Sequence, residues 1–162
     1  MKIISWLQII GGVTGIWLVA YLMLRTETIN GPILLILLTG LGLFTYSIYS
    51  GKRLLTDEGK TAGIILSIIN QAIQLLKWSM FGYGLSYSSG AEIVLGIQGL
   101  IFKFNLAVIA SNFKMAINSE SEFFIKINVI AVFVLIVLID IFKELKAKTK
   151  NQIEPQETGT GD

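Results

Sequence analysis

The apolar run from Ile3 to Leu24 constrains this chain most, because it carries no charged side chain before it stops at Arg25. A helix rises about 1.5 Å per residue, so the run is long enough to cross a hydrocarbon layer about 30 Å thick. The alternative is a signal peptide, which needs a shorter apolar core and a cleavage site of small residues. The following RTET, residues 25–28, offers no such site. We therefore expect a retained membrane helix.

Three further apolar runs cover residues 32–50, 61–81 and 124–142. The composition agrees with a membrane protein, because 53% of the residues are hydrophobic and only 15% are charged. In soluble domains, roughly a quarter of the residues are charged. We predict an all-α, multi-pass membrane bundle of about four transmembrane helices, over 3–24, 32–50, 61–81 and 124–142. These helices form one integral membrane domain, residues 1–148.

The segment between the third and fourth runs, residues 82–119, shows a period of two. Phe102, Phe104 and Leu106 alternate with more polar neighbours, and 83–88, 93–97 and 113–118 follow the same pattern. Such alternation indicates strands, and the pairs at 89–90, 98–99 and 111–112 suit tight connections. We predict a small antiparallel β meander of about four short strands, which makes the fold α+β overall. The alternative is a fifth span over 91–110, which would bury Lys103 and Asn105 in the bilayer.

The predicted sheet has two chemically different faces. An open sheet edge is not tolerated in hydrocarbon, so the sheet must lie outside the bilayer or be covered by protein. Its polar face would carry Lys103, Asn105, Lys114 and Asn118. The opposite face is aromatic and is the candidate partner-facing surface, with Tyr83, Tyr87, Phe102, Phe104 and Phe113.

The third run carries a polar stripe, with Ser67, Asn70, Gln74 and Lys77 at spacings of three, four and three, and Gln71 on an adjacent stripe. This spacing places the side chains on one helical face. Polar residues in a span usually face a bundle interior or a water-filled cavity. A polar pathway for a small solute is one interpretation, and hydrogen bonding between helices is the other.

Two other features of the apolar runs carry hypotheses. Asp140 precedes Lys143 by three residues, which fits an interfacial ion pair, with a proton relay as the alternative. Gly11 and Gly15 form a Gly-x-x-x-Gly pair, a spacing that lets helix backbones approach closely. Internal packing is the expected role of this pair.

The distribution of basic residues predicts an orientation. With four spans, Lys2, the pair Lys52-Arg53 and the lysines after residue 142 share one side. The positive-inside rule then places both termini in the cytoplasm, and we expect a bacterial inner membrane. Segment 82–119 would be extracytoplasmic, and residues 149–162 would form a disordered cytoplasmic tail.

The absence of Cys and His excludes several chemistries. Triads that depend on histidine, zinc sites built from His or Cys, and iron–sulfur clusters all require these residues. We therefore expect no catalytic, cofactor-binding or metal site, and we expect that the chain is not an enzyme. The net charge of +2 also argues against a nucleic-acid partner.

These expectations leave two hypotheses about function. The first is a non-enzymatic accessory or structural subunit that lies in a lipid bilayer and binds another membrane protein or a second copy of itself. The second is an oligomeric small-solute transporter, channel or membrane-permeabilising protein that uses the polar face of the third run.

Overall fold

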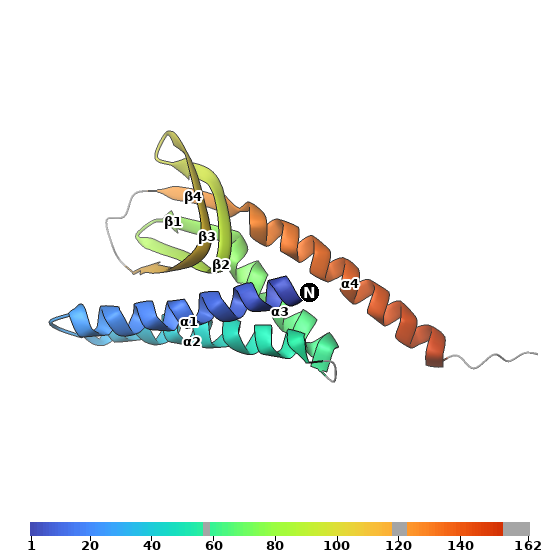
Figure 1. Ribbon diagram of the computed structural model, residues 1–162. Coiled ribbons are helices and arrows are strands. Elements are labelled where there is room, and N and C mark those ends of the chain that lie inside the picture. The colour runs from blue at the N-terminus through green and yellow to red at the C-terminus, as the bar shows by residue number, and fades with distance from the viewer. Residues whose placement is uncertain (57–58, 118–122, 154–162) are drawn as a thin grey trace, which may run out of the picture.

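The computed structural model describes residues 1–56, 59–117 and 123–153. Helices and strands are segregated along the chain, with three helices, then four strands, then a last helix (Figure 1). In order they are α1 (Lys2–Arg25), α2 (Gly31–Leu55), α3 (Lys60–Leu75), β1 (Leu76–Met80), β2 (Tyr83–Gln98), β3 (Ile101–Ala116), β4 (Phe124–Asn128) and α4 (Val129–Ile153).

The two first helices form a long antiparallel hairpin, with α1 and α2 side by side along their length (Figure 1). The Asn30 side chain accepts a hydrogen bond of 3.0 Å from the backbone N–H of Ile33 and so caps the start of α2. Close approach depends on small residues, because a Cβ added to Gly15 would lie 2.0 Å from the Phe44 ring. Gly15 therefore packs inside the chain, as expected from the Gly-x-x-x-Gly spacing.

The prediction of a four-helix transmembrane bundle is wrong. Within the described residues, only α1 and α2 are both long and apolar enough to cross a membrane. α3 has 16 residues, which at about 1.5 Å per residue is shorter than a bilayer core. The second half of α4 is interrupted by charged side chains, including Asp140, Lys143 and Glu144.

The third apolar run ends in a strand, and the fourth apolar run begins in a strand. Residues 76–80 form β1 and residues 124–128 form β4, and the two strands pair with each other through Leu76–Ile127 and Trp78–Ile125. β1 alternates apolar and polar side chains, as does β4 from Ile125 to Asn128, which suits a sheet with two different faces. The expected spans 61–81 and 124–142 therefore stop at Leu75 and start at Val129 respectively.

The sheet has the order β1-β4-β2-β3, which differs from the expected meander of four short strands. β2 and β3 are long partners joined at residues 99–100, whereas the expected breaks at 89–90 and 111–112 lie inside them. The last residues of the expected segment, 118–119, lie outside the described residues. No helix occupies 91–110, so the alternative of a fifth helical span is also wrong.

A bulge bends β2 between Gly90 and Glu92, and Gly90 has a φ of +121°. α1 crosses the sheet at this point, since a Cβ added to Gly11 would lie 2.1 Å from the backbone nitrogen of Gly90. The bend lets β1 pair with the beginning of β2 and β4 pair with its end, while β1 and β4 also pair with each other. The sheet therefore curls around one of its faces.

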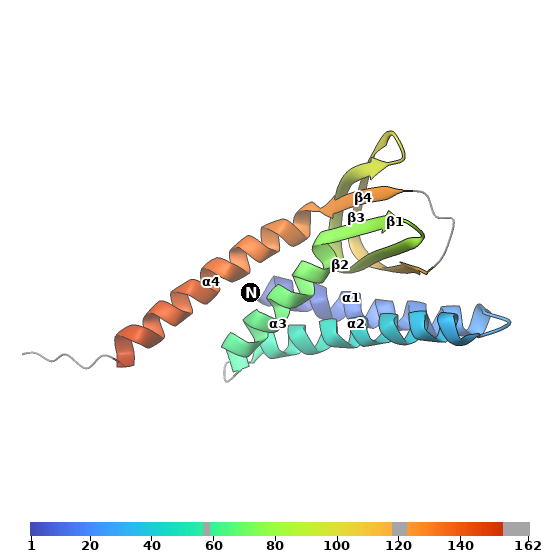
Figure 2. The same ribbon diagram turned by 180° about the vertical axis from the view of Figure 1, so that it is seen from behind.

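α4 continues from β4 and runs obliquely away from the hairpin (Figure 2). Its first turn is capped by Asn128, whose Oδ1 accepts hydrogen bonds of 3.4 Å from the backbone N–H groups of Ala131 and Ile93. α4 packs on α3 through Val134 and Leu138, which form an apolar cluster with Leu54 and Ile64. The helix extends to Ile153, and residues 154–162 of the expected tail lie outside the described residues.

The distribution of polar and apolar side chains is inverted relative to a soluble domain. Among the described residues, 15 polar or charged residues are buried against 10 apolar ones. Long apolar side chains cover the outside instead, including Trp17, Leu24, Phe102 and Phe133. Soluble domains bury apolar residues and expose charged ones. This surface therefore suits lipid or another protein better than water.

Candidate functional site

The concave face of the curled sheet carries a row of lysines across neighbouring strands. Lys77 on β1 lies directly opposite Lys126 on β4, Lys126 lies opposite Gly96 on β2, and Gly96 lies opposite Lys103 on β3. Directly opposed residues share one face of a sheet. Three of the four positions in this row are therefore lysines whose side chains start from the same face.

Gly96 makes the row possible. A Cβ at this position would lie 2.3 Å from the carbonyl oxygen of Ile125 and 2.6 Å from Cγ of Lys126. The missing side chain lets β4 approach β2 closely.

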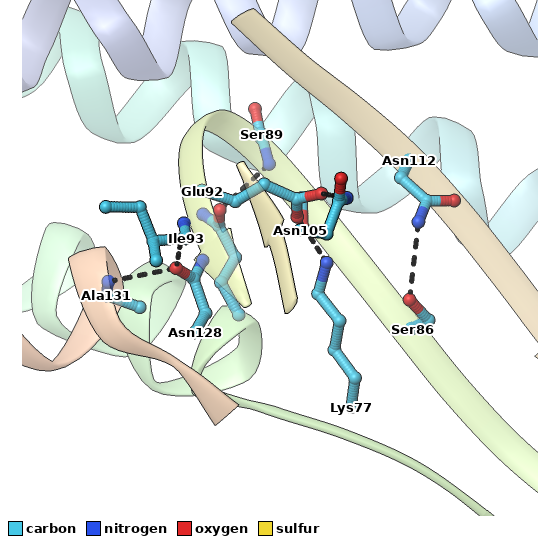
Figure 3. Close-up of polar contacts among 11 residues, drawn as sticks. Lys77, Ser86, Ser89, Glu92, Ile93, Asn105, Asn112, Asn128 and Ala131 are labelled. Atoms are coloured by element: carbon cyan, nitrogen blue, oxygen red, sulfur yellow. Dashed lines mark hydrogen bonds and ion pairs between the residues drawn. The ribbon is translucent and has the colours of Figure 1, made fainter. Parts of the chain in front are cut away.

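Glu92 is the acidic residue of this face and is itself buried, with 4% of its surface exposed. It forms an ion pair with Lys77 (Figure 3). The hydroxyl of Ser88 also donates to its carboxylate. The amide nitrogen of Asn105 approaches the other carboxylate oxygen at 3.5 Å. One carboxylate thus neutralises Lys77 and anchors three strands to one another.

Lys77, Glu92 and Asn105 line a cavity of about 210 Å³, which we call the lysine chamber. It contains four lysines and one glutamate among its described lining residues, hence a formal charge of 4 − 1 = +3. Lys103 and Lys114 at its rim are exposed, whereas Lys77 and Glu92 form its floor. The remaining lining residues are Ser86, Val94, Gln98, Asn105, Asn112, Phe124 and Lys126.

The charge of the chamber acts on Lys126. Burial lowers the pKa of the Lys126 ammonium, and the positive charges of Lys103, Lys77 and Lys114 lower it further. Lys126 donates a hydrogen bond of 2.8 Å to Oε1 of Gln98 and lies 4.8 Å from the centre of the Phe124 ring. Neither of these contacts supplies a negative charge, so Lys126 depends on other groups for neutralisation.

The polar stripe predicted on the third run forms a second buried cluster, between α3, α1, α2 and β2. Ser67 donates to Oε1 of Gln8 at 3.1 Å, and Asn70 donates to Oγ of Ser47 at 3.1 Å. Oε1 of Gln74 accepts a hydrogen bond of 2.8 Å from the backbone N–H of Ser89. Ser67, Asn70 and Gln74 therefore lie together and bind neighbouring elements.

Two members of the predicted stripe behave differently. Lys77 lies in β1 and lines the lysine chamber, because the chain changes from helix to strand at residue 76. Gln71 is buried beside a separate cavity of about 20 Å³ that Gln8 and Ala91 also line. A cavity of this size holds about one water molecule.

The aromatic residues predicted to face a partner divide into two groups. Tyr83, Phe102 and Phe104 are exposed. Tyr87 is fully buried against Phe44, and its hydroxyl donates a hydrogen bond of 2.9 Å to the backbone carbonyl of Leu43.

Phe113 also packs on the helices, beside Gly40. Tyr87 therefore faces the protein's own helices and Phe113 is partly buried against them, so these two residues lie apart from the exposed aromatic side chains of the sheet.

Asp140 and Lys143 lie on an exposed part of α4. Among the described residues, the ion pair that the structure shows is between Lys77 and Glu92, and Asp140 and Lys143 do not form one. The hypothesis of an interfacial pair on α4 thus has no contact to support it here.

Sequence reasoning missed the importance of Glu92 and Lys126. The period of two at 93–97 and 101–106 already placed Glu92, Lys103 and Asn105 on polar positions. Lys126 was assigned to a helix, so its position beside Lys77 and Lys103 was hidden. Only the pairing of β4 with β1 and β2 brings these lysines together.

Comparisons with protein-family models, curated proteins and solved structures find no match to this chain.

Proposed function

We propose that this chain is a non-enzymatic membrane protein that acts as an accessory subunit of another membrane protein. In this proposal α1 and α2 lie in lipid, and the exposed part of the sheet packs against the partner. The observation that carries the proposal is the inverted surface, with apolar side chains outside and polar side chains inside. Large exposed apolar surfaces mark membrane or protein contacts.

The position of the sheet favours a protein partner over lipid alone. β2 contacts α1 at Gly11, and Phe113 of β3 contacts α2 at Gly40, so the sheet lies against the flank of the hairpin. A hairpin that crosses the bilayer therefore holds part of the sheet at membrane depth.

Among the described strands, β3 pairs only with β2, and its residues 101–106 are exposed. Backbone groups at such an edge need hydrogen-bond partners within a membrane. A neighbouring protein can supply these partners, whereas lipid chains cannot.

The proposal includes an orientation in a cell membrane. Lys2, Lys52 and Arg53 lie at one end of the α1–α2 hairpin, and Arg25 lies at the other. The positive-inside rule then places the N-terminal end of the hairpin in the cytoplasm. A bacterial inner membrane fits this bias.

The alternative function, a transport pathway along α3, receives less support. The side chains of Ser67, Asn70 and Gln74 are hydrogen-bonded to α1, α2 and β2. Those bonds stabilise the packing of the helices, and the cavity beside Gln71 is about 20 Å³.

The proposal can be tested by photo-crosslinking in intact membranes. A benzoylphenylalanine at Phe104, on the exposed sheet, should form a discrete adduct with one integral membrane protein. The matched control is Leu38 on α2, which is similarly exposed (54% against 63%). Because lipid should surround Leu38, the same probe there should give no protein adduct.

A second measurement uses purification in mild detergent. Phe104→Ser should release the partner while the chain remains in the membrane fraction after alkaline carbonate extraction. A monodisperse, partner-free chain, or identical adducts from positions 104 and 38, would contradict the proposal. Complete extraction by carbonate would contradict the membrane assignment itself.

A further inference from the structure

We propose that the lysine chamber binds an anion that carries a phosphate group. The binding determinants are Lys103, Lys114 and Lys126, with Asn105 as an additional donor, while the ion pair between Lys77 and Glu92 forms the floor. This inference does not depend on the proposed accessory function.

The first argument is charge balance on one face of one sheet. Neighbouring strands lie about 4.8 Å apart, and like charges on directly opposed residues destabilise a sheet. Lys77 and Lys126 are directly opposed, and Lys103 lies one strand further, across Gly96. Glu92 compensates only one of the four positive charges that line the chamber. A bound anion with more than one negative charge would neutralise the remainder.

The second argument concerns the donors and the space. The chamber of about 210 Å³ is far larger than the roughly 10–15 Å³ of cavity volume that holds one water molecule. Lysine ammonium groups bind phosphate as mobile point charges, each with three N–H donors. Lys103 and Lys114 are exposed at the rim, and Lys126 is half-buried, so their long side chains can turn toward one ligand.

The third argument is that the floor of the chamber is already fixed. Glu92 accepts hydrogen bonds from Lys77, Ser88 and Asn105, which joins β1, β2 and β3 around the cavity. A preorganised site loses less entropy on binding than a flexible surface does. The structure therefore offers a shaped cationic site rather than scattered surface lysines.

A phosphate group can come from a lipid headgroup or from a soluble compound. Basic pockets in membrane proteins bind anionic lipid headgroups, and the apolar surface beside this chamber would be compatible with acyl chains. The chemistry recognised by the chamber is the same in both cases. The experiment must therefore offer both sources.

The test uses the full chain, purified in a neutral detergent. Pyrophosphate is titrated by calorimetry, and binding of short-chain phosphatidic acid is followed by native mass spectrometry, with phosphatidylcholine as the zwitterionic comparison. We expect saturable 1:1 binding of at least one of the two phosphate compounds. Pyrophosphate binding alone would identify a soluble ligand, and phosphatidic acid binding alone would identify a lipid.

The key variant is Lys103→Gln combined with Lys114→Gln, both at exposed positions where folding should be preserved. Binding should weaken by at least about tenfold, because two charge-assisted contacts are lost. The Arg counterparts at both positions should retain binding. Lys146→Gln with Lys148→Gln removes the same charge from an exposed part of α4 and should change binding by less than about twofold.

Equal weakening in the two double variants would show general electrostatic attraction and overturn the site. Absence of saturable binding by either phosphate compound would also overturn it.

Discussion

Lys77 on β1 and Lys126 on β4 are direct cross-strand partners, so two lysines face the same chamber from opposed positions. Only Lys77 has a carboxylate partner among the described residues, since Glu92 pairs with it. Lys126 meets Gln98 and the Phe124 ring instead. This unequal neutralisation leads to a prediction about pH.

Lys126→Gln should raise the stability of the chain near neutral pH. It should also reduce the increase in stability that the original chain shows as the pH becomes alkaline. The pKa of Lys126 is lowered by burial and by Lys103, Lys77 and Lys114. A lowered lysine pKa means that the unfolded chain binds more protons between the folded and unfolded pKa values. Stability from this group therefore increases with pH in that window, up to the ordinary lysine pKa of about 10.4.

The measurement is thermal unfolding in detergent across neutral to alkaline pH. Glu92, which also lines the chamber, is unchanged in the Lys126→Gln variant, so the comparison with the original chain isolates Lys126. Lys146→Gln is the control and should keep the pH profile of the original chain. An unchanged pH profile in Lys126→Gln would show that neither burial nor the neighbouring lysines lower the pKa of Lys126.

The ion pair between Lys77 and Glu92 should behave as a coupled unit. Glu92→Gln leaves a buried ammonium without its partner and should destabilise the chain by about 3–5 kcal/mol. Lys77→Met combined with Glu92→Gln removes both charges and should cost less than the sum of the single changes. A double-mutant cycle from denaturant or thermal unfolding measures the coupling, and additive costs would refute it.

The contact between α1 and β2 predicts a difference between two glycines. Gly11→Ala places a methyl group 2.1 Å from the backbone nitrogen of Gly90 and should destabilise the chain by about 1–3 kcal/mol. Gly42→Ala meets nothing within 4 Å and should be neutral or slightly stabilising, because alanine favours helix by about 1 kcal/mol. Circular dichroism during thermal unfolding measures both, and equal effects would argue against the packing of α1 on the bulge.

Tyr87 and Tyr83 should respond differently to removal of the hydroxyl. Tyr87→Phe deletes the donor to the Leu43 carbonyl and should cost about 1–2 kcal/mol. Tyr83→Phe changes an exposed residue and should lie within about 0.5 kcal/mol of the original chain. The midpoint of unfolding reports both changes, and a partner-binding defect in Tyr87→Phe without loss of stability would contradict the inward position of Tyr87.

Apolar run length and period-two alternation contain real information about this chain. The first two runs become α1 and α2, and the alternation around Phe102 and Phe104 becomes part of β3. These patterns are local, since a helix and a strand each expose their side chains with a fixed period. The same sequence also placed Ser67, Asn70 and Gln74 on one face of α3, where the structure joins them to other elements.

Composition could not separate a third span from a helix followed by a strand. Residues 61–81 and 124–142 are apolar throughout much of their length, and both helices and buried strands accept such residues. Strand pairing determines that strands rather than helices begin at Leu76 and at Phe124. β1 and β4 satisfy each other's backbone hydrogen bonds, and both pair with β2. Partners so far apart in the sequence leave no local signal.

The sequence by itself therefore determined the apolar hairpin, the alternating faces and the absence of His and Cys. The tertiary structure decided which polar side chains meet. The bulge at Gly90 curls β2 so that β1, β4 and β3 surround one face, and this curvature gathers Lys77, Lys103, Lys114 and Lys126 around Glu92. Charge interactions depend on distance in space, and that distance is set by strand register and curvature rather than by spacing along the chain.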